Sequence, residues 1–197
     1  MSLFYLSLLI NSMEKKTTID EITIRTKLQP GDLGYIIHRH GILYKQEYDY
    51  GIGFENYVAR GLQEFYDQYD PSLDRVWICE HQNIIIGFLF LIHRPGHISQ
   101  LRYLLIEPEY RGIGLGKKLM ELFLEFHHSL NYASCYLWTT HEQEAAGALY
   151  KKFGFQLTEE KESTAFGKRV REQRYELETI EYRNIEQGIL NKEFRSK

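Results

Sequence analysis

The chain has 197 residues, of which 43% are hydrophobic and 26% are charged, and its formal net charge at pH 7 is −3. This composition is ordinary for a globular protein, and the length suits one domain with a buried core. The small negative charge argues against nucleic acid as a partner, because such a partner requires a strongly basic surface. Cys79 and Cys135 are too few for a disulfide framework, so we expect reduced thiols in a cytoplasmic protein.

The N-terminal segment contains an apolar run over residues 3–10. It is too short to cross a membrane and lacks both the basic flank and the cleavage site of a signal peptide, so we expect no membrane partner. Met13 begins a charged segment that is typical of a true start, and residues 1–12 are interpreted as a start-site extension. We predict an N-terminal extension over 1–21, a folded domain over 22–178 and a charged tail over 179–197.

Periodicity and turn signals predict the elements in chain order. A short alternating strand over 22–25 precedes a turn, and Asp32 is expected to cap the helix after it. A hairpin is expected at His81-Gln82-Asn83. The complete prediction is a strand over 22–25, helices over 33–47 and 54–69, strands over 76–79, 84–92 and 98–106, a helix over 115–130, a strand over 133–139, a helix from about 145 that ends at Gly154, and an antiparallel pair over 156–161 and 174–177 around the loop 163–169.

A glycine-rich turn separates the strand over 98–106 from the helix that follows. Its sequence is Arg111-Gly112-Ile113-Gly114-Leu115-Gly116. At a helix start, unpaired backbone N–H groups and the positive end of the dipole attract an anion, and glycine lets a ligand approach the backbone. The turn therefore predicts a phosphate or pyrophosphate site. It fits neither the dinucleotide fingerprint, whose third glycine comes later, nor the Walker pattern, because Lys118 replaces the required Ser or Thr.

With its R-x-x-G-x-G spacing, the turn resembles the pyrophosphate-binding motif of the GNAT superfamily of N-acetyltransferases, which use acetyl-coenzyme A. A second segment also matches, since the family pattern A-x-x-x-Y-x-x-x-G-F falls on Ala146, Tyr150, Gly154 and Phe155. The resemblance covers about residues 22–178. It implies an α/β (α+β) fold with a mixed central sheet of about six to seven strands and helices on both faces. Segments 38–44 and 100–102 further resemble acetyltransferase domains fused to MarR-type regulators.

The resemblance also implies where acetyl-coenzyme A binds. Backbone groups of Leu104, Leu105 and Ile106 would pair with the pantetheine arm, and the turn would hold the pyrophosphate. At Gln143 the family often has an asparagine that contacts the coenzyme. The remaining residues expected at the coenzyme are Arg111, Gly112, Ile113, Gly114, Leu115, Gly116, Lys117, Gln143 and Tyr150. No metal is expected, because His38 and His40 point to different sides of a helix.

Acetyl transfer to an amine needs an acid for the leaving thiolate and a base for the amine. Tyr150 is the expected acid, because a phenol with a pKa of about 10 is protonated at neutral pH; the alternative is a core tyrosine. The positions where relatives place a glutamate base hold Gln100 and Trp138. We take Glu107 as the second catalytic residue. The other candidates for the base, besides a water relay to solvent, are Glu47, His38, His40 and His97.

The acceptor amine is expected between the first two helices and the separated fourth and fifth strands. The residues expected to bind it are His38, Arg39, His40, Tyr44 and Glu47. Arg39 would pair with a carboxylate of the substrate and Glu47 with its ammonium. We predict acetyl-coenzyme-A-dependent, direct N-acetylation of a primary amine of a small metabolite, amino acid or peptide. The alternative is a non-catalytic coenzyme-binding sensor or partner module, and apolar strand edges make a homodimer the assembly to test.

Overall fold

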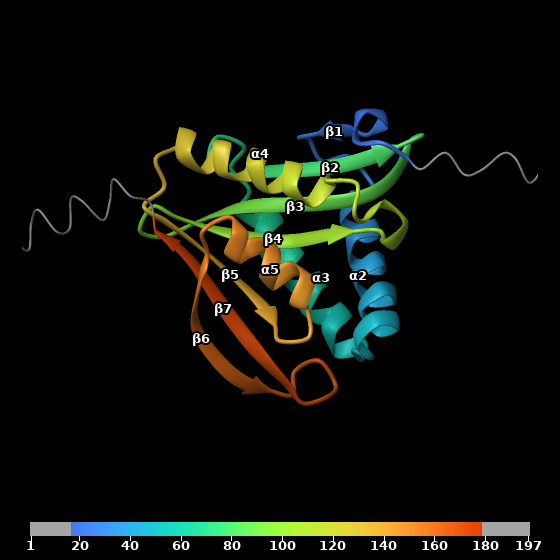
Figure 1. Ribbon diagram of the computed structural model, residues 1–197, viewed down its shortest axis with the longest axis vertical. Helices are drawn as coiled ribbons and strands as arrows, with labels where there is room; N and C mark the ends of the chain where they lie inside the picture. Colours follow the sequence, from blue (N-terminus) through green and yellow to red (C-terminus); the bar gives the residue numbers. More distant parts are fainter. Residues whose placement is uncertain (1–16, 179–197) are drawn as a thin grey trace, which may run out of the picture.

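The computed structural model describes residues 17–178, which form one mixed sheet of seven strands with helices on both faces (Figure 1). The predicted fold class is confirmed. Residues 1–16 of the predicted extension, with Met13, and the tail over 179–197 lie outside the described residues. The elements are η1 (Ile19–Glu21), β1 (Thr23–Arg25), α2 (Asp32–Tyr48), α3 (Ile52–Asp67), β2 (Arg75–His81), β3 (Ile84–Arg94), β4 (Ile98–Ile106), η2 (Pro108–Tyr110), α4 (Leu115–Ser129), β5 (Ser134–Thr140), α5 (Glu144–Lys152), β6 (Gln156–Ser163) and β7 (Val170–Glu178).

The strands follow the spatial order β1-β2-β3-β4-β5-β7-β6. Every neighbouring pair is antiparallel except β4 and β5, which run parallel and are joined by the crossover helix α4. The predicted hairpin between β2 and β3 is confirmed. Its turn residues Gln82 and Asn83 have φ angles of 52° and 64°, as a tight two-residue hairpin turn requires.

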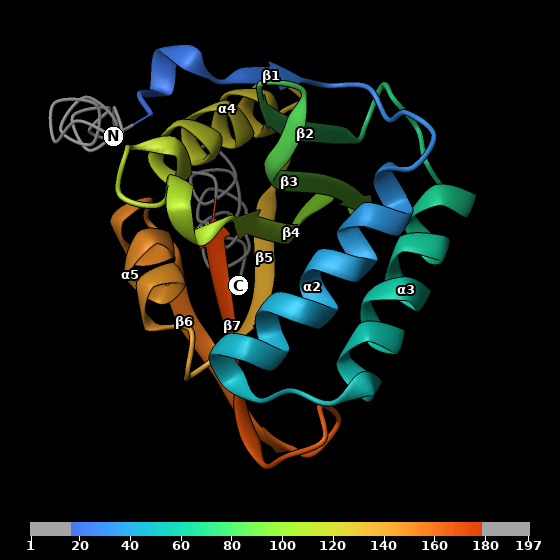
Figure 2. The ribbon, with the colours of Figure 1, turned by 90° about the vertical axis from the view of Figure 1, so that its right-hand side faces the viewer.

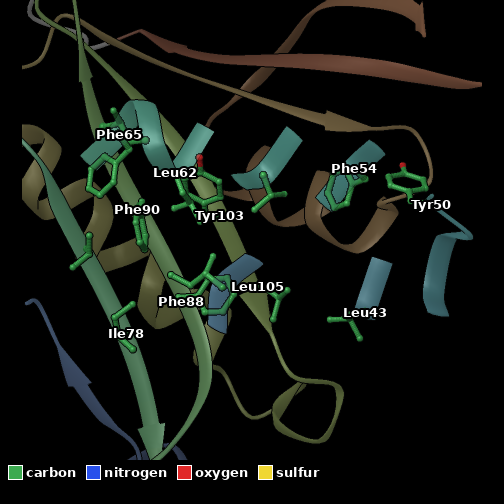
Figure 3. Close-up of a cluster of buried hydrophobic side chains, with 14 of the residues drawn as sticks. Leu43, Tyr50, Phe54, Leu62, Phe65, Ile78, Phe88, Phe90, Tyr103 and Leu105 are labelled. Carbon is green, nitrogen blue, oxygen red and sulfur yellow. The ribbon is translucent and has the colours of Figure 1, made fainter. Parts of the chain in front are cut away.

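The central strands β2, β3 and β4 are buried on both faces because two helices cover each face of the sheet, whereas the outer strand β6 is exposed (Figure 2). Neighbouring residues of β2 therefore enter different cores: Ile78 packs under α2 and α3, and Cys79 packs under α4 and α5. Figure 3 shows the first of these cores, where the rings of Phe65 on α3 and Phe90 on β3 lie 5.0 Å apart. Full burial of one such side chain contributes about 1.5–3 kcal/mol to folding, so the helices are held mainly by these apolar contacts.

Strand β4 contains a bulge. Phe88 of β3 lies opposite Leu105, but Phe90, two residues further on, lies opposite Arg102, three residues back. Strand β4 therefore carries one extra residue at this point. Within the bulge, Tyr103 has a φ of 57°, which a bulky side chain seldom adopts. A bulge bends its strand and strengthens the local twist, so β4 changes direction here.

The bend is accompanied by a separation of β4 from β5. The two strands pair only over 98–100 opposite 134–136 in the structure described for residues 17–178. Beyond that point β5 continues along β7, with which it pairs from Ser134 to Thr140. The carboxyl-terminal half of β4 consequently presents an unpaired edge, and a wedge opens between it and β5.

The connection between β6 and β7 bridges the far end of this wedge. The backbone N–H of Gly51 donates to the carbonyl of Phe166 at 2.8 Å. The Nζ atom of Lys168 donates to the carbonyl of Tyr48 at 2.8 Å and binds Oε1 of Glu142 at 2.6 Å. These contacts attach the loop 164–169 to the junction of α2 and α3.

Some predicted boundaries and one predicted role are wrong. Gly31 is the N-cap of α2, and Asp32 is the first helical residue instead of the cap. The buried carboxylate of Asp32 instead accepts two hydrogen bonds from Arg25, at 2.7 and 2.8 Å. Strand β7 begins at Val170, four residues earlier than predicted, because the Val170 side chain is buried in the core shared with α2 and α3.

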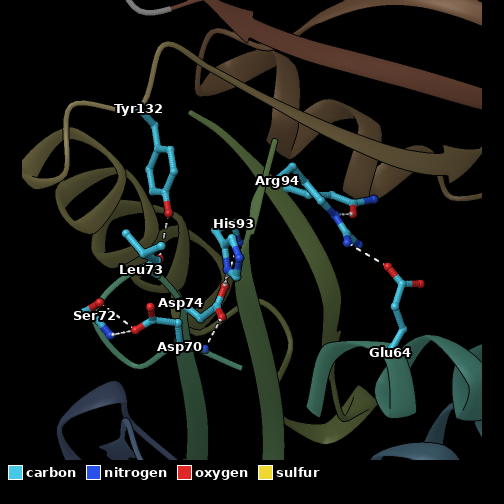
Figure 4. A network of polar contacts seen from close by, with 9 residues as sticks. Glu64, Asp70, Ser72, Leu73, Asp74, His93, Arg94 and Tyr132 are labelled. Carbon is cyan, nitrogen blue, oxygen red and sulfur yellow. Dashed lines mark hydrogen bonds and ion pairs between the residues drawn. The ribbon is translucent and has the colours of Figure 1, made fainter. Parts of the chain in front are cut away.

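A polar network connects the loop before β2 with β3 and β4 (Figure 4). The carboxylate of Asp74, which is buried, accepts the backbone N–H of His93 at 2.6 Å and bonds to its ring Nδ1 at 2.9 Å. The adjacent Arg94 pairs with Glu64 of α3 at 2.8 Å and donates from Nε to Oε1 of Gln100 at 2.8 Å. The network therefore fixes the side chain of Gln100 at the point where β4 and β5 separate.

The close approach of β3 to β4 beside the bulge gives a test of this geometry. A Cβ atom at Gly87 would lie 2.9 Å from the carbonyl oxygen of Leu105, whereas one at Gly34 in α2 would meet nothing within 4 Å. We expect Gly87→Ala to lower the free energy of unfolding by about 1–3 kcal/mol. The control Gly34→Ala should raise it by about 0.5–1 kcal/mol, since alanine favours a helix. Urea unfolding measures both changes, and an unaltered Gly87→Ala protein would contradict the register described here.

Candidate active site

The wedge between β4 and β5 opens into a groove bounded by α2, α3 and α5. It contains about 720 Å³ of empty space, which includes open solvent at its mouth. The wall is rich in aromatic side chains, with contributions from both helices, both strands and the loop 164–169. Besides Tyr150, the aromatic side chains that line the groove are Tyr44, Phe54, Tyr57, Tyr103, Trp138 and Phe166.

The predicted glycine turn forms a loop of left-handed backbone at the start of α4. Gly112 and Gly114 have φ angles of 77° and 93°, which glycine adopts without strain. Gly114 is the N-cap, and no side chain caps the helix. The N–H of Lys118 makes the first intrahelical bond, to Gly114 at 3.0 Å, so the N–H groups of residues 115–117 have no partner within the helix. These donors, together with the helix dipole, suit a pyrophosphate.

The unpaired edge of β4 presents backbone groups to the wedge. The N–H of Glu107 donates to Ile86 of β3 at 2.9 Å. Because backbone groups alternate in direction along a strand, the N–H and C=O of Ile106 then face away from β3 and toward the wedge. The carbonyl of Ile106 accepts a bond from Nε of Arg111 at 3.0 Å. Its N–H remains directed at the space between β4 and β5.

Tyr150 brings a phenol to the groove from α5. Its side chain lines the groove and is 5% exposed, with the rings of Phe155 and Tyr175 each 6.1 Å away. Burial raises the pKa of Tyr150 above its ordinary value of about 10. The hydroxyl is therefore protonated at neutral pH and can donate a proton to a group bound in the groove.

Gln143 lies between α2 and β5 at the start of α5. Its Oε1 accepts hydrogen bonds from the hydroxyl of Thr139 at 3.0 Å and, weakly, from that of Tyr44 at 3.4 Å. Both partners also line the groove. The oxygen of the side-chain amide is thus occupied, and the Gln143 side chain also bonds to Tyr50, so Gln143 joins α2, β5 and the segment after α2.

Two predicted site residues, Glu107 and Arg39, bind each other. The guanidinium of Arg39 donates from Nε to Oε1 of Glu107 at 2.6 Å and from Nη2 to Oε2 at 2.5 Å. Neither side chain lines the groove. Both oxygens of the carboxylate are occupied, so Glu107 is a poor proton acceptor and Arg39 is a poor ligand for a substrate carboxylate. The pair instead joins α2 to the end of β4.

A second ion pair changes the interpretation of Arg111 and Glu47. Nη2 of Arg111 lies 2.8 Å from Oε1 of Glu47, while its Nε holds the Ile106 carbonyl. Arg111 therefore links the glycine turn to Glu47 and to the end of β4. Glu47 is consequently not free to bind a substrate ammonium. Lys117 lies 3.4 Å from Glu121 in an exposed pair, which is worth little and leaves its ammonium accessible.

None of the three candidate histidines is suited to be the base. His38 is exposed on α2 and does not line the groove. His97 lies in the turn between β3 and β4 and bonds to the Leu130 carbonyl at 3.0 Å. His40 does line the groove, but burial lowers its pKa to about 4, and its Nδ1 bonds to Ile36 at 2.8 Å. His40 is consequently neutral and only weakly basic at pH 7.

Much of the groove wall consists of residues that the sequence did not predict for the site. Phe54 and Tyr57 belong to the amphipathic period of α3, where an aromatic residue has the same pattern whether it fills the core or lines a cleft. Phe166 lies in a loop whose position depends on contacts more than a hundred residues away. Arg102 carried a usable signal, because it is a cation within the largely apolar sequence of β4.

Two further observations limit the kind of site. Over residues 17–178, no group of three or more His, Cys, Asp and Glu side chains could hold a metal ion. In the same part of the chain, none of the helices has the length and apolar character needed to cross a membrane.

Comparison with known proteins defines the family. The model of the acetyltransferase (GNAT) domain matches residues 72–157, which include the bulge, the glycine turn and Tyr150. An uncharacterized N-acetyltransferase of Schizosaccharomyces pombe is 37% identical over 119 residues, which are 59% of this chain and 72% of that protein. The chain therefore belongs to the GNAT family of N-acetyltransferases.

Other relatives agree at lower coverage. The uncharacterized N-acetyltransferase YjgM of Escherichia coli K12 is 31% identical over 98 residues, which are 48% of this chain and 59% of YjgM. The chain thus spans about three-fifths of the length of that relative. A spermidine N-acetyltransferase from Vibrio cholerae, solved with CoA and spermine, has a TM-score of 0.62 at 22% identity, covering 83% of this chain and 98% of that chain. At this identity the likeness establishes the fold.

The ion pair between Arg39 and Glu107 leads to a prediction about Glu107. If Glu107 only positions the end of β4, Glu107→Gln should lower the free energy of unfolding by about 1–3 kcal/mol and reduce kcat less than about tenfold. Loss of a general base would instead reduce kcat by roughly 10²–10⁴. Urea unfolding and steady-state kinetics distinguish the two, with the exposed Glu125→Gln as the control. A large loss of kcat in a fully stable variant would restore Glu107 as the base.

Proposed function

We propose that this protein transfers an acetyl group directly from acetyl-coenzyme A to a primary amine of a small metabolite, amino acid or peptide. The observation that carries the proposal is the wedge between β4 and β5. It brings the unpaired edge of β4 at Leu104 and the Tyr150 phenol to one groove, and β4 leads on to a helix start whose first N–H groups have no partner within the helix. The folded domain, which we take as residues 22–178, contains all three.

The residues around the wedge suit the coenzyme. The N–H groups of residues 115–117 supply donors for the pyrophosphate, and the absence of a Cβ at Gly112 and Gly114 leaves the backbone open to it. The unpaired edge at Leu104 and Ile106 supplies backbone groups for the pantetheine amides, in the manner of an added strand. The exposed ammonium of Lys117 is accessible for a further contact, and Gln143 lines the groove at the family position that often contacts the coenzyme.

Two steps of the reaction are assigned to groups of this chain, namely stabilisation of the oxyanion and protonation of the leaving thiolate. The N–H of Ile106 faces the wedge and would stabilise the oxyanion that forms when an amine attacks the thioester carbonyl. The Tyr150 hydroxyl, protonated because burial raises its pKa, would donate its proton to the thiolate that leaves. After transfer, the phenolate regains a proton from solvent.

Removal of the amine's proton is assigned to water. Gln100 and Trp138 occupy the positions where a glutamate would be expected, and Glu172, which also lines the groove, is paired with Lys161 at 3.5 Å. The amine therefore reacts in its neutral form after losing a proton to solvent through the open mouth of the groove. The lack of a strong base also favours the second candidate, a coenzyme-binding sensor or partner module with little turnover.

Some finer features belong to the same proposal. The kinship with MarR-fused acetyltransferase domains rests on the sequence of segments 38–44 and 100–102, and residues of both segments line the groove. Cys79 and Cys135 are free and buried, as in a protein of the reducing cytoplasm. A homodimer remains the assembly to test.

Binding of acetyl-coenzyme A is the first test of this function. A ligand at about 100 times its Kd should stabilise the native state by roughly 2.7 kcal/mol, which raises Tm by about 5–10 °C at this size. We expect this shift with acetyl-coenzyme A and not with ATP or NAD. In Gly114→Asp the shift should vanish, because a carboxylate would face the pyrophosphate. An equal shift in that variant would disprove the turn as the coenzyme site.

The role of Tyr150 is tested by Tyr150→Phe. We expect kcat, measured as free thiol release across a panel of amines, to fall by roughly 10²–10⁴ while the Tm shift with acetyl-coenzyme A persists, because only the proton donor is lost. Tyr175→Phe, which alters a neighbouring ring outside the groove, is the matched control. An unchanged kcat in Tyr150→Phe would remove Tyr150 from the mechanism.

Deprotonation by water predicts a particular pH dependence. Because only the neutral amine reacts, kcat/KM should rise tenfold per pH unit below the pKa of the amine and level off above it. Two acceptors with different amine pKa values should therefore give two different inflections. His40 should contribute none between pH 6 and 8, because its pKa is lowered to about 4. An inflection at one fixed pH for both acceptors would instead reveal a base on the enzyme.

A further inference from the structure

The groove contains one positive charge that has no counter-ion. Two charged side chains line it, Arg102 and Glu172, and Glu172 is paired with Lys161 at 3.5 Å. Arg102 makes no ion pair and no side-chain hydrogen bond among residues 17–178, although it also lines a second hollow that contains Glu64 and Asp67 of α3. Its guanidinium lies over the rings of Tyr57, at 5.5 Å, and Tyr103, at 4.8 Å. Stacking occupies the faces of a guanidinium and leaves its N–H edge for a ligand.

A second donor lies two residues earlier on β4. The side chain of Gln100 lines the groove, and its Oε1 accepts the Nε–H of Arg94 at 2.8 Å. A guanidinium can only donate, so this contact assigns the amide oxygen to Arg94 and turns the NH₂ group of Gln100 elsewhere. The position where relatives place a glutamate base thus holds a neutral side chain whose unoccupied end is a donor.

The backbone of α3 leaves room for Arg102. A Cβ atom at Gly61 would lie 2.6 Å from Nη2 of Arg102 and 2.6 Å from the hydroxyl oxygen of Tyr103. Glycine inside a helix costs about 0.5–1 kcal/mol relative to alanine, yet here it lets both groups approach the helix. The Tyr103 hydroxyl is buried and has no hydrogen-bond partner among the described residues. Arg102 and Tyr103 therefore place two donors side by side against α3.

These donors suit an anion more than a cation. Charge-assisted bonds from a guanidinium and neutral donors are the usual contacts of a carboxylate. A polyamine would instead bring its second ammonium near an uncompensated Arg102. From these contacts we propose that the acceptor amine also carries a carboxylate, which binds Arg102, as in an α-amino acid with an apolar or aromatic side chain. The proposal rests on the acetyl-transfer function given above and names its class of substrate.

The test compares acceptors that differ in the carboxylate. Phenylalanine, phenylalaninamide and spermidine are used at saturating acetyl-coenzyme A, and kcat/KM is expressed per concentration of neutral amine to remove the difference in amine pKa. Loss of a charged hydrogen bond of about 1.5–3 kcal/mol corresponds to roughly a 10- to 100-fold loss. We expect phenylalanine to exceed both other amines by at least about tenfold. Arg102→Met should lower only the phenylalanine value, and Arg171→Met, at an exposed position on β7 that does not line the groove, should change nothing.

A binding measurement makes the result independent of turnover. Calorimetry of the protein with CoA should detect N-acetylphenylalanine and not N-acetylphenylalaninamide, and Arg102→Met should abolish the difference. Gly61→Ala, which displaces Arg102 without removing it, should weaken N-acetylphenylalanine in the same way. In each variant, an unaltered Tm shift with acetyl-coenzyme A shows that the fold and the coenzyme site are intact.

These outcomes distinguish failure of the proposed carboxylate site from failure of the proposed acetyl-transfer function. Equal use of phenylalaninamide or spermidine, equal losses for both amines in Arg102→Met, or no binding of N-acetylphenylalanine to the wild-type complex would each overturn the carboxylate site, even if acetyl transfer is observed. Absence of any Tm shift with acetyl-coenzyme A would overturn both the transfer function and this inference.

Discussion

The bulge in β4 is the constraint on which the site depends. One extra residue at Tyr103 bends the strand, and pairing with β5 ends at Gln100. A strand inside a sheet normally pairs along both of its edges. Because β4 separates from β5, part of β4 has an unpaired backbone edge although the strand lies inside the sheet. The same strand leads directly to the glycine turn, and the bend therefore determines how the coenzyme-binding backbone and the acceptor groove face each other.

Ion pairs support this geometry without entering the chemistry. Arg39 and Glu107 hold α2 against the end of β4, and Arg111 connects Glu47 to the carbonyl of Ile106. The loop 164–169 closes the opposite end through its contacts with the junction of α2 and α3. The groove is thus an opening within the sheet whose two ends are held by these contacts, and its charged lining residues are Arg102 and Glu172.

The sequence predicted the features that depend on local physics. Gly112 and Gly114 predicted a ligand-accessible turn at a helix start, and the short connection His81-Gln82-Asn83 between two apolar runs predicted the hairpin of β2 and β3. The roles of Glu107 and Arg39 could not be predicted, because the two side chains meet across 68 positions of sequence. The bulge could not be predicted either, because one added residue changes no visible pattern in a strand whose residues are largely apolar on both faces. Arg102 stood out as a charge among apolar neighbours, but its lack of a partner is visible only in three dimensions.

The central claim is that the free backbone groups of the wedge hold acetyl-coenzyme A. Amide hydrogen exchange with and without saturating acetyl-coenzyme A tests it most directly, because it reports on the N–H groups themselves. We expect acetyl-coenzyme A to slow amide hydrogen exchange at Leu104, at Ile106 and over residues 112–117. Exchange in the edge strands β1 and β6 should not change. Binding that leaves these amides unprotected, or protects a different part of the sheet, would contradict the claim.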